Sequence, residues 1–291
     1  MFDRILVPSD GSDPSVAAAE AATALARRFG ATLHVVHVVD TNELPLGADT
    51  AVVEALVSRG ETVVDGAADA ATAAGVDVET AVLRDGAVAH RAIVTYAADH
   101  DVDLVVMGTH GRTGLDRFVL GSVAEWTIRL SPAPVLALHG ETAFDAAFAD
   151  VVVPTDGSDA AEHAAGLAVE LAAATGAALH VVHVVDLGVV WQDADAGQVL
   201  DALTESGREA VERVVERAET AGVEGLEASV LRGAPHRAIV DYAADHDADL
   251  VVMGTHGRTG LERYLLGSVT ERVVRLSETP VLAVPDAAAG D

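Results

Sequence analysis

The chain has 291 residues, of which 50% are hydrophobic and only 3% are aromatic, and its formal net charge is -28. This acidity argues against non-specific binding to nucleic acid or to an anionic membrane, because both are polyanions. The sequence has no cysteine, which excludes disulfides and thiolate metal sites.

The acidic excess also bears on the medium in which the protein works. All 18 basic residues are arginine, and the 46 acidic residues would repel one another at low ionic strength. Molar salt shortens the Debye length to about 3 Å and removes most of this repulsion. Acidity without lysine is therefore typical of proteins from salt-accumulating halophiles, which include halophilic archaea.

The first half of the chain alternates short apolar runs with longer helical patterns. The expected strands cover residues 4–7, 33–39, 78–83, 104–107 and 135–138. The expected helices cover residues 12–28, 50–74, 88–98 and 122–130. Ser12 or Asp13 can cap the first helix, and Gly30 and Gly75 end the first two. Strands that alternate with helices predict right-handed crossovers and a parallel, doubly wound α/β sheet.

The second half of the chain repeats the first at an offset of 146 positions. Residues 90–123 and 236–269 differ at only five of 34 positions. A short connection at 139–150 separates the copies, so we expect two tandem domains at 1–140 and 148–285. The chain enters its first strand without a leader, and no apolar run approaches the roughly 18 residues of a membrane span, so we expect a cytoplasmic protein.

A glycine-rich loop follows the fourth expected strand of each copy. Gly108 and Gly111 remove side chains where backbone N–H groups can approach an anion. Gly121 and Ser122 then open a helix, whose free N–H groups and dipole favour a phosphate. Arg112 can neutralise phosphate charge from the same loop. The sequence therefore predicts a phosphate-binding loop in each copy.

The spacing of the glycines narrows the kind of site. A Walker A loop is absent because the chain has no lysine, and the dinucleotide fingerprint is missing after the first strand. The spacing Gly-x2-Gly-x9-Gly-Ser, found at 108–122 and again at 254–268, instead resembles the ATP-binding signature of the universal stress protein family. The strand ends that lead to Asp10, to Asp40 and to Asp156 are similar to that family too. The resemblance covers essentially the whole chain, in two tandem copies.

The resemblance implies two Rossmann-like domains with five-stranded sheets of order 3-2-1-4-5 that bind ATP, with or without Mg²⁺. It implies that Asp10 contacts ribose or phosphate and that the Val38 backbone holds adenine. The implied nucleotide-binding residues of the first copy are Pro8, Asp10, Val38, Met107, Gly108, Gly111, Arg112, Gly121, Ser122 and Val123. Those of the second copy are Pro154, Asp156, Val184, Met253, Gly254, Gly257, Arg258, Gly267, Ser268 and Val269. Family members pair through their fifth strands, which implies an intramolecular pseudo-dimer and leaves a further homodimer open.

Other polar residues are candidates for catalysis or metal binding. His34 and His37 look like a metal pair, but positions three apart on a strand face opposite sides, which favours local packing. His110 and His256 lie inside the glycine loops, where they could touch a phosphate or face water. The Ser12 and Ser158 hydroxyls resemble helix caps rather than nucleophiles, and neither lies in a Gly-x-Ser-x-Gly elbow.

Two complete loops without a matching catalytic set favour an ATP-binding stress regulator with unknown protein partners, which hydrolyses ATP slowly or not at all. The first alternative is an ATP-dependent enzyme of related fold, for which no substrate domain is left over. The second alternative is an interaction module whose nucleotide site is vestigial.

Overall fold

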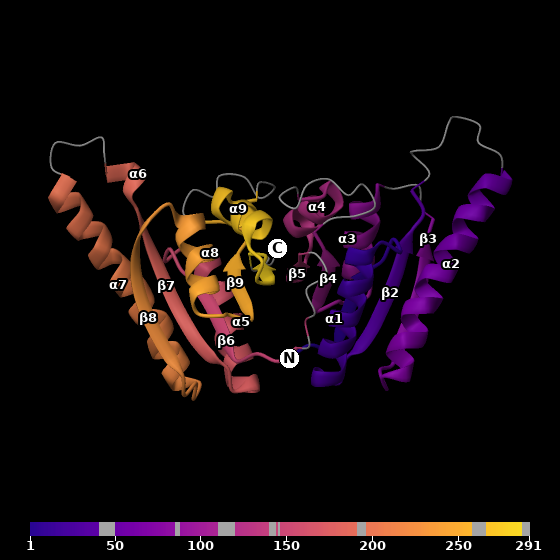
Figure 1. The fold of residues 1–291 in the computed structure, drawn as a ribbon, viewed down its shortest axis with the longest axis horizontal. Coiled ribbons are helices and arrows are strands. Elements are labelled where there is room, and N and C mark those ends of the chain that lie inside the picture. The colour runs from indigo at the N-terminus through magenta and orange to yellow at the C-terminus, as the bar shows by residue number, and fades with distance from the viewer. Residues whose placement is uncertain are drawn as a thin grey trace. The chain divides into compact units, whose positions relative to one another are not determined.

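The computed structural model describes residues 1–40, 50–84, 88–109, 120–139, 144, 146–190, 196–257 and 266–286. The chain forms two compact units, Met1–Ala146 and Ala147–Asp291. Each unit is a parallel sheet with helices packed against it (Figure 1). None of the helices in the described ranges is both long enough and apolar enough to span a bilayer.

The sheet of the first unit runs in the order β3-β2-β1-β4-β5 with every pair parallel. Its strands are β1 (Arg4–Pro8), β2 (Thr32–Val38), β3 (Val78–Leu83), β4 (Leu104–Gly108) and β5 (Val135–Leu138). The predicted fold class and strand order are confirmed. Each strand begins and ends within one residue of the expected position, because turn residues and glycines bound the apolar runs closely.

Two pairs of helices cover the sheet of the first unit. They are α1 (Asp13–Phe29), α2 (Thr50–Ala73), α3 (Ala89–Asp99) and α4 (Ser122–Leu130). Helix α1 packs on β1 and β4 and also contacts α2, which packs on β2 and β3. Helices α3 and α4 pack on each other and contact β2 and β5. This is the doubly wound arrangement that the alternation of elements predicted.

Glycine ends the first helix as expected, whereas the serine at its start behaves differently. Gly30 adopts the left-handed conformation with φ 69° as the C-cap of α1. Ser12 occupies the N-cap position, but its side chain makes no capping hydrogen bond and its hydroxyl donates to Asp10 Oδ1. In the second unit, the Ser158 hydroxyl does accept a bond from the Ala161 N–H at 3.3 Å. The expectation that both hydroxyls cap helices is therefore correct only for Ser158.

The second unit repeats this topology in the order β8-β7-β6-β9-β10. Its strands are β6 (Asp150–Pro154), β7 (Ala178–Asp186), β8 (Leu226–Gly233), β9 (Leu250–Gly254) and β10 (Val281–Val284). Its helices are α5 (Asp159–Thr175), α6 (Leu187–Val190), α7 (Ala196–Thr220), α8 (Pro235–Asp245) and α9 (Ser268–Leu276). Strands β6 and β9 are almost wholly buried, so they form the centre of the core.

The last residue of the fourth strand in each unit touches the first turn of a helix. A Cβ at Gly254 would lie 2.8 Å from the Ala160 carbonyl oxygen of α5, and one at Gly108 would lie 2.8 Å from the Pro14 carbonyl oxygen of α1. Neither glycine is among those with positive φ. These glycines are therefore required for close packing between strand and helix, a reason that the sequence did not reveal.

Replacing Gly254 with alanine tests this packing. We expect Gly254→Ala to lower the free energy of unfolding by about 1–3 kcal/mol, because the added methyl must push α5 away from β9. The measurement is the urea concentration at the midpoint of unfolding of the second unit, or of the whole chain if both units unfold together.

The matched control is Gly197→Ala on α7, where no atom lies within 4 Å of the added Cβ. Alanine there should be neutral or stabilise the helix by roughly 0.5–1 kcal/mol. Equal effects of the two substitutions would contradict the close contact at Gly254.

Candidate nucleotide-binding site

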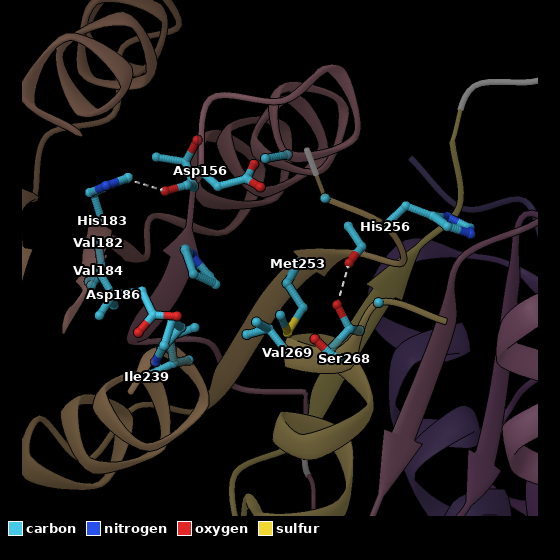
Figure 2. Close-up of a pocket in the computed structure, with 18 of the residues that line it drawn as sticks. Asp156, Val182, His183, Val184, Asp186, Ile239, Met253, His256, Ser268 and Val269 are labelled. Carbon is cyan, nitrogen blue, oxygen red and sulfur yellow. Dashed lines mark hydrogen bonds between the residues drawn. The ribbon is translucent and has the colours of Figure 1, made fainter. Parts of the chain in front are cut away.

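A cavity of about 410 Å³ opens at the carboxyl edge of the second unit's sheet. The ends of β6, β7 and β9 contribute to it, together with the first turns of α8 and α9 (Figure 2). Strands β6 and β9 are neighbours in the sheet. The connection after β6 leads to β7 on one side of this pair, and the connection after β9 leads to β10 on the other side, so a crevice forms between the carboxyl ends of β6 and β9. Ligands of doubly wound sheets bind at this position.

The structure brings together the second-copy residues that the signature predicted. Those that line the cavity are Pro154, Asp156, Val184, Met253, Gly254, Gly257, Gly267, Ser268 and Val269. The remaining one, Arg258, lies outside the described residues, so the structure does not place it. Residues separated by more than a hundred positions in the chain thus meet around one cavity.

The first-copy residues occupy the matching ends of their own elements. Pro8, Val38 and Gly108 are the last residues of β1, β2 and β4, and Met107 precedes Gly108. Gly121 is the N-cap of α4, while Ser122 and Val123 begin it. Asp10 follows β1. Gly111 and Arg112, and the loop histidine His110, lie outside the described residues.

A tight turn fixes the carboxylate of Asp156 beside the cavity. Its Oδ1 accepts hydrogen bonds from the Ser158 N–H at 3.0 Å and from the Ser158 hydroxyl at 2.6 Å. Gly157 between them has φ 76°, a conformation that favours glycine. A Cβ at Gly257 would lie 2.9 Å from Asp156 Oδ2, so the loop after β9 approaches this carboxylate through bare backbone. The arrangement presents an acceptor of fixed orientation, suited to hydroxyl groups or to a cation.

The backbone of Val184 offers hydrogen-bonding groups to the cavity. The Thr155 N–H donates to the Val182 carbonyl at 2.8 Å, which is the last bond between the chain after β6 and strand β7. Backbone groups alternate sides along a strand, so Val184 also faces towards β6, beyond the point where β6 has ended. Its N–H and C=O therefore meet the cavity instead of a neighbouring strand. This is a physical reason for a planar, hydrogen-bonding base to bind there.

The start of α9 supplies the opposite side of the cavity. Gly267 is the N-cap of α9, and its N–H donates to the Thr255 carbonyl at 2.8 Å. The Thr270 hydroxyl donates to the Gly254 carbonyl at 2.8 Å, which anchors the helix to the end of β9. The N–H groups of Ser268 and Val269 belong to the first turn, where no earlier carbonyl within the helix can accept from them. This end of the helix favours an anion.

The two sides of the cavity differ in chemistry. Figure 2 shows Val182, Val184 and Ile239 on one side, and Ser268 and Val269 on the other, with Asp156 between them. An apolar side that bears backbone hydrogen-bonding groups suits a heterocyclic base, and the helix start suits phosphate. The cavity volume lies within the roughly 300–1,000 Å³ range of small-molecule sites.

Two segments, residues 1–139 and 147–285, match the model of the universal stress protein family. The chain belongs to this family. A universal stress protein of Methanocaldococcus jannaschii is 43% identical over 137 residues, which are 46% of this chain and 80% of that protein. One of Mycobacterium bovis is 33% identical over 190 residues, which are 63% of this chain and 62% of that protein, so the chain spans less than two thirds of this relative's length.

A solved structure extends the similarity to the whole tandem chain. The crystal structure of a universal stress protein from Archaeoglobus fulgidus has a TM-score of 0.75 and 24% sequence identity, and the match covers 99% of this chain and 98% of that chain. At this identity the similarity shows the fold.

Several cavity residues of this universal stress protein were not predicted from its sequence. They are Thr155, Ala161, Val182, His183, Val185, Asp186, Leu203, Pro235, Ile239 and Thr270. Pro235 and Ile239 lie at the start of α8, next to or within the segment 236–269, which is nearly identical to 90–123. This near identity of the two copies is a sequence signal that could have identified them. Leu203 comes from α7, whose sequence gave no sign that it reaches the site.

The loop histidine His256 is held by its neighbours. Its Nδ1 lies 2.9 Å from the Thr255 hydroxyl and 3.7 Å from a carboxylate oxygen of Asp286. These contacts tie the ring to the ends of β9 and β10. They leave the Nε2 atom buried without a hydrogen-bond partner in a residue that lines the cavity, so contact between His256 and a phosphate stays a prediction.

The paired histidines on β2 face opposite sides of the sheet, as their spacing predicted. His34 Nδ1 lies 3.1 Å from the Tyr96 hydroxyl of α3, whereas His37 Nδ1 lies 2.7 Å from the Ser9 carbonyl and its ring packs on Gly60 of α2. Both side chains are buried. Burial lowers the pKa of His34, and the nearby His100 and Arg4 lower it further, while Glu79 acts in the opposite direction.

The lowered pKa of His34 predicts a loss of stability in acid. As the pH drops below the unfolded-state pKa of about 6.5, the unfolded chain takes up a proton at this position before the folded chain does. The free energy of unfolding therefore decreases as the pH decreases. We expect His34→Asn, which keeps a polar atom near Tyr96, to reduce the decrease in thermal midpoint between pH 7 and pH 5.

The control is His163→Gln, at an exposed position of α5. It should leave the pH dependence as it is in the wild type. A steeper decrease in the His34→Asn variant would show that His34 does not oppose protonation in the folded state.

Proposed function

We propose that this universal stress protein is a stress-response regulator that binds one ATP in each repeat and hydrolyses it slowly or not at all. One observation carries the proposal: the second unit gathers all the described second-copy residues of the ATP signature around one cavity. The near identity of 90–123 and 236–269 extends the proposal to the first repeat.

The chemistry of the cavity supports an adenine nucleotide over a bare anion. Adenine would pack against Val182 and Ile239 and hydrogen-bond the Val184 backbone. Ribose hydroxyls would donate to Asp156, whose carboxylate is held by Ser158. The phosphates would accept from the first N–H groups of α9, where the helix dipole adds favourable electrostatic energy. A Mg²⁺ ion between the phosphates would also find an oxygen ligand at Asp156.

The carboxylates that line the cavity support slow hydrolysis. Rapid phosphoryl transfer needs a group that positions the attacking water and metal ions that neutralise the developing charge. Asp156 Oδ1 is engaged by Ser158, and Asp186 Oδ1 accepts a bond from the Gly188 N–H at 2.8 Å. Each carboxylate therefore holds a turn with one oxygen, and Asp156 would use the other for ribose or Mg²⁺ rather than for positioning water. A regulator needs only that ATP binding changes the conformation of the loops.

The nucleotide content of the purified protein tests the proposal directly. We expect the denatured protein to release about two adenine nucleotides per chain, one for each matched repeat, measured by ion-pair chromatography. Release of no nucleotide, together with no ATP binding by titration, would favour an interaction module with a vestigial site. A steady-state turnover well above about 1 s⁻¹ would favour the enzyme instead.

Replacement of Gly267 with valine tests the placement of the phosphates. A Cβ at this position already lies 3.2 Å from the Thr255 carbonyl oxygen, so a valine side chain must displace the start of α9. We expect Gly267→Val to weaken ATP binding at the second site at least tenfold, about 1.4 kcal/mol, in isothermal titration.

The matched variant Gly121→Val should weaken the first site alone, and the double variant should weaken both. Gly197→Ala, which is distant in the sequence from the starts of α4 and α9, should retain ATP binding at both sites. Unchanged affinity in the double variant would mean that the phosphates do not bind at the starts of α4 and α9.

A further inference from the structure

Three side chains that commonly ligate metals meet at the other edge of the second unit's sheet. His180 lies near the start of β7, and Glu227 occupies the paired position near the start of β8. His246 follows α8 as its C-cap residue. One ligand atom from each of the three lies within 4.8 Å of the others. The cluster is at the amino ends of the strands, whereas the nucleotide cavity is at their carboxyl ends.

Hydrogen bonds fix which ring nitrogen of each histidine carries the proton. His246 Nδ1 lies 2.8 Å from the Tyr242 carbonyl oxygen, which can only accept, so Nδ1 donates and Nε2 keeps its lone pair. His180 Nε2 lies 2.9 Å from Asp150 Oδ1, so Nε2 donates and the neutral ring has its lone pair on Nδ1. His180 Nδ1 in turn lies 3.5 Å from Glu227 Oε2. Metal-bound histidines are oriented in the same way, by an oxygen that accepts from the other ring nitrogen.

We propose that His180, Glu227 and His246 bind one divalent transition-metal ion of the zinc class, with water as a further ligand. Two imidazoles and one carboxylate are a ligand set that suits Zn²⁺. The charges also match, because Glu227 supplies one negative charge and Asp150 supplies another beside His180.

The geometry allows closure around an ion with small movements. Tetrahedral Zn²⁺ with bonds of about 2.0–2.1 Å needs ligand atoms roughly 3.3 Å apart. The Glu227 side chain is 61% exposed and can rotate towards the rings. The His246 ring stacks on Tyr242 with centroids 3.9 Å apart, which holds its orientation. The Tyr242 hydroxyl, 3.2 Å from His180 Nδ1, is the group that the metal replaces there.

The first unit contains the same cluster with one change of charge. His34, Glu79 and His100 correspond to the three ligands, but Arg4 stands where the second unit has Asp150. Arginine cannot accept from a histidine N–H, and its positive charge opposes a cation. The two histidine rings are also further apart, with centroids at 5.9 Å against 5.3 Å in the second unit. The metal site is therefore confined to the second unit.

Titration of the tag-free, full-length protein with Zn²⁺ tests the proposal. We expect one high-affinity ion per chain, and a cobalt derivative with the absorption of a tetrahedral site. His246→Gln and Glu227→Gln should each weaken binding at least tenfold, while far-ultraviolet circular dichroism reports an unchanged fold. The matched substitution in the first unit, His100→Gln, should leave the affinity as it is in the wild type.

Binding that His246→Gln leaves unaffected would overturn the proposal, and so would an equal loss in His100→Gln. A metal ion bound only through ATP phosphates would be unaffected by His246→Gln. Binding at the nucleotide site therefore cannot produce the expected loss. Arg4→Asp supplies the reverse test, because a carboxylate beside His34 should add a second, weaker ion per chain. No gain in stoichiometry would show that the charge at this position does not separate the two clusters.

Discussion

The candidate site depends on a close approach between the end of β9 and the first turn of α5. Only a residue without a side chain fits there, because the Ala160 carbonyl occupies the place of a Cβ on Gly254. This contact brings the turn that holds Asp156 next to the loop that leads to α9. The same approach of Gly108 to Pro14 occurs in the first unit. The first glycine of each signature therefore meets a packing requirement that both units share.

The elements of the fold were predictable because the chain marks their boundaries locally. Apolar runs, an Ala-rich helix and the glycines at 30 and 75 placed most elements to within one or two residues. The order of the strands came from the resemblance to the family, since pairing between distant strands leaves no local pattern. The role of Ser12 was predicted incorrectly: it lies at the N-cap position without a capping hydrogen bond, although Ser158 donates the equivalent bond to its own aspartate and still caps its helix.

The candidate site was predictable in part. The resemblance to the family pointed to residues that do surround the cavity, because they lie at or just after the ends of β6, β7 and β9, which are neighbours in the sheet. The contributions of Leu203 and Ile239 depend on how α7 and α8 pack, which the sequence does not encode at those positions alone. The histidine cluster was missed for a related reason. Spacing along one strand drew attention to His34 and His37, the counterparts of His180 and His183, whereas the partners of His180 come from β8 and from the end of α8.

The paired clusters at the amino ends of the strands have a consequence for how this chain can evolve. After a tandem duplication, each half can accumulate its own substitutions, while both halves remain in one polypeptide and are made in equal amounts. The segments 90–123 and 236–269, which contain the glycine loops, have stayed nearly alike, with five differences in 34 positions. At the amino edges a single exchange, Arg4 against Asp150, reverses the charge beside an otherwise matching set of side chains. One codon thus suffices for a division of labour between two copies of the same fold.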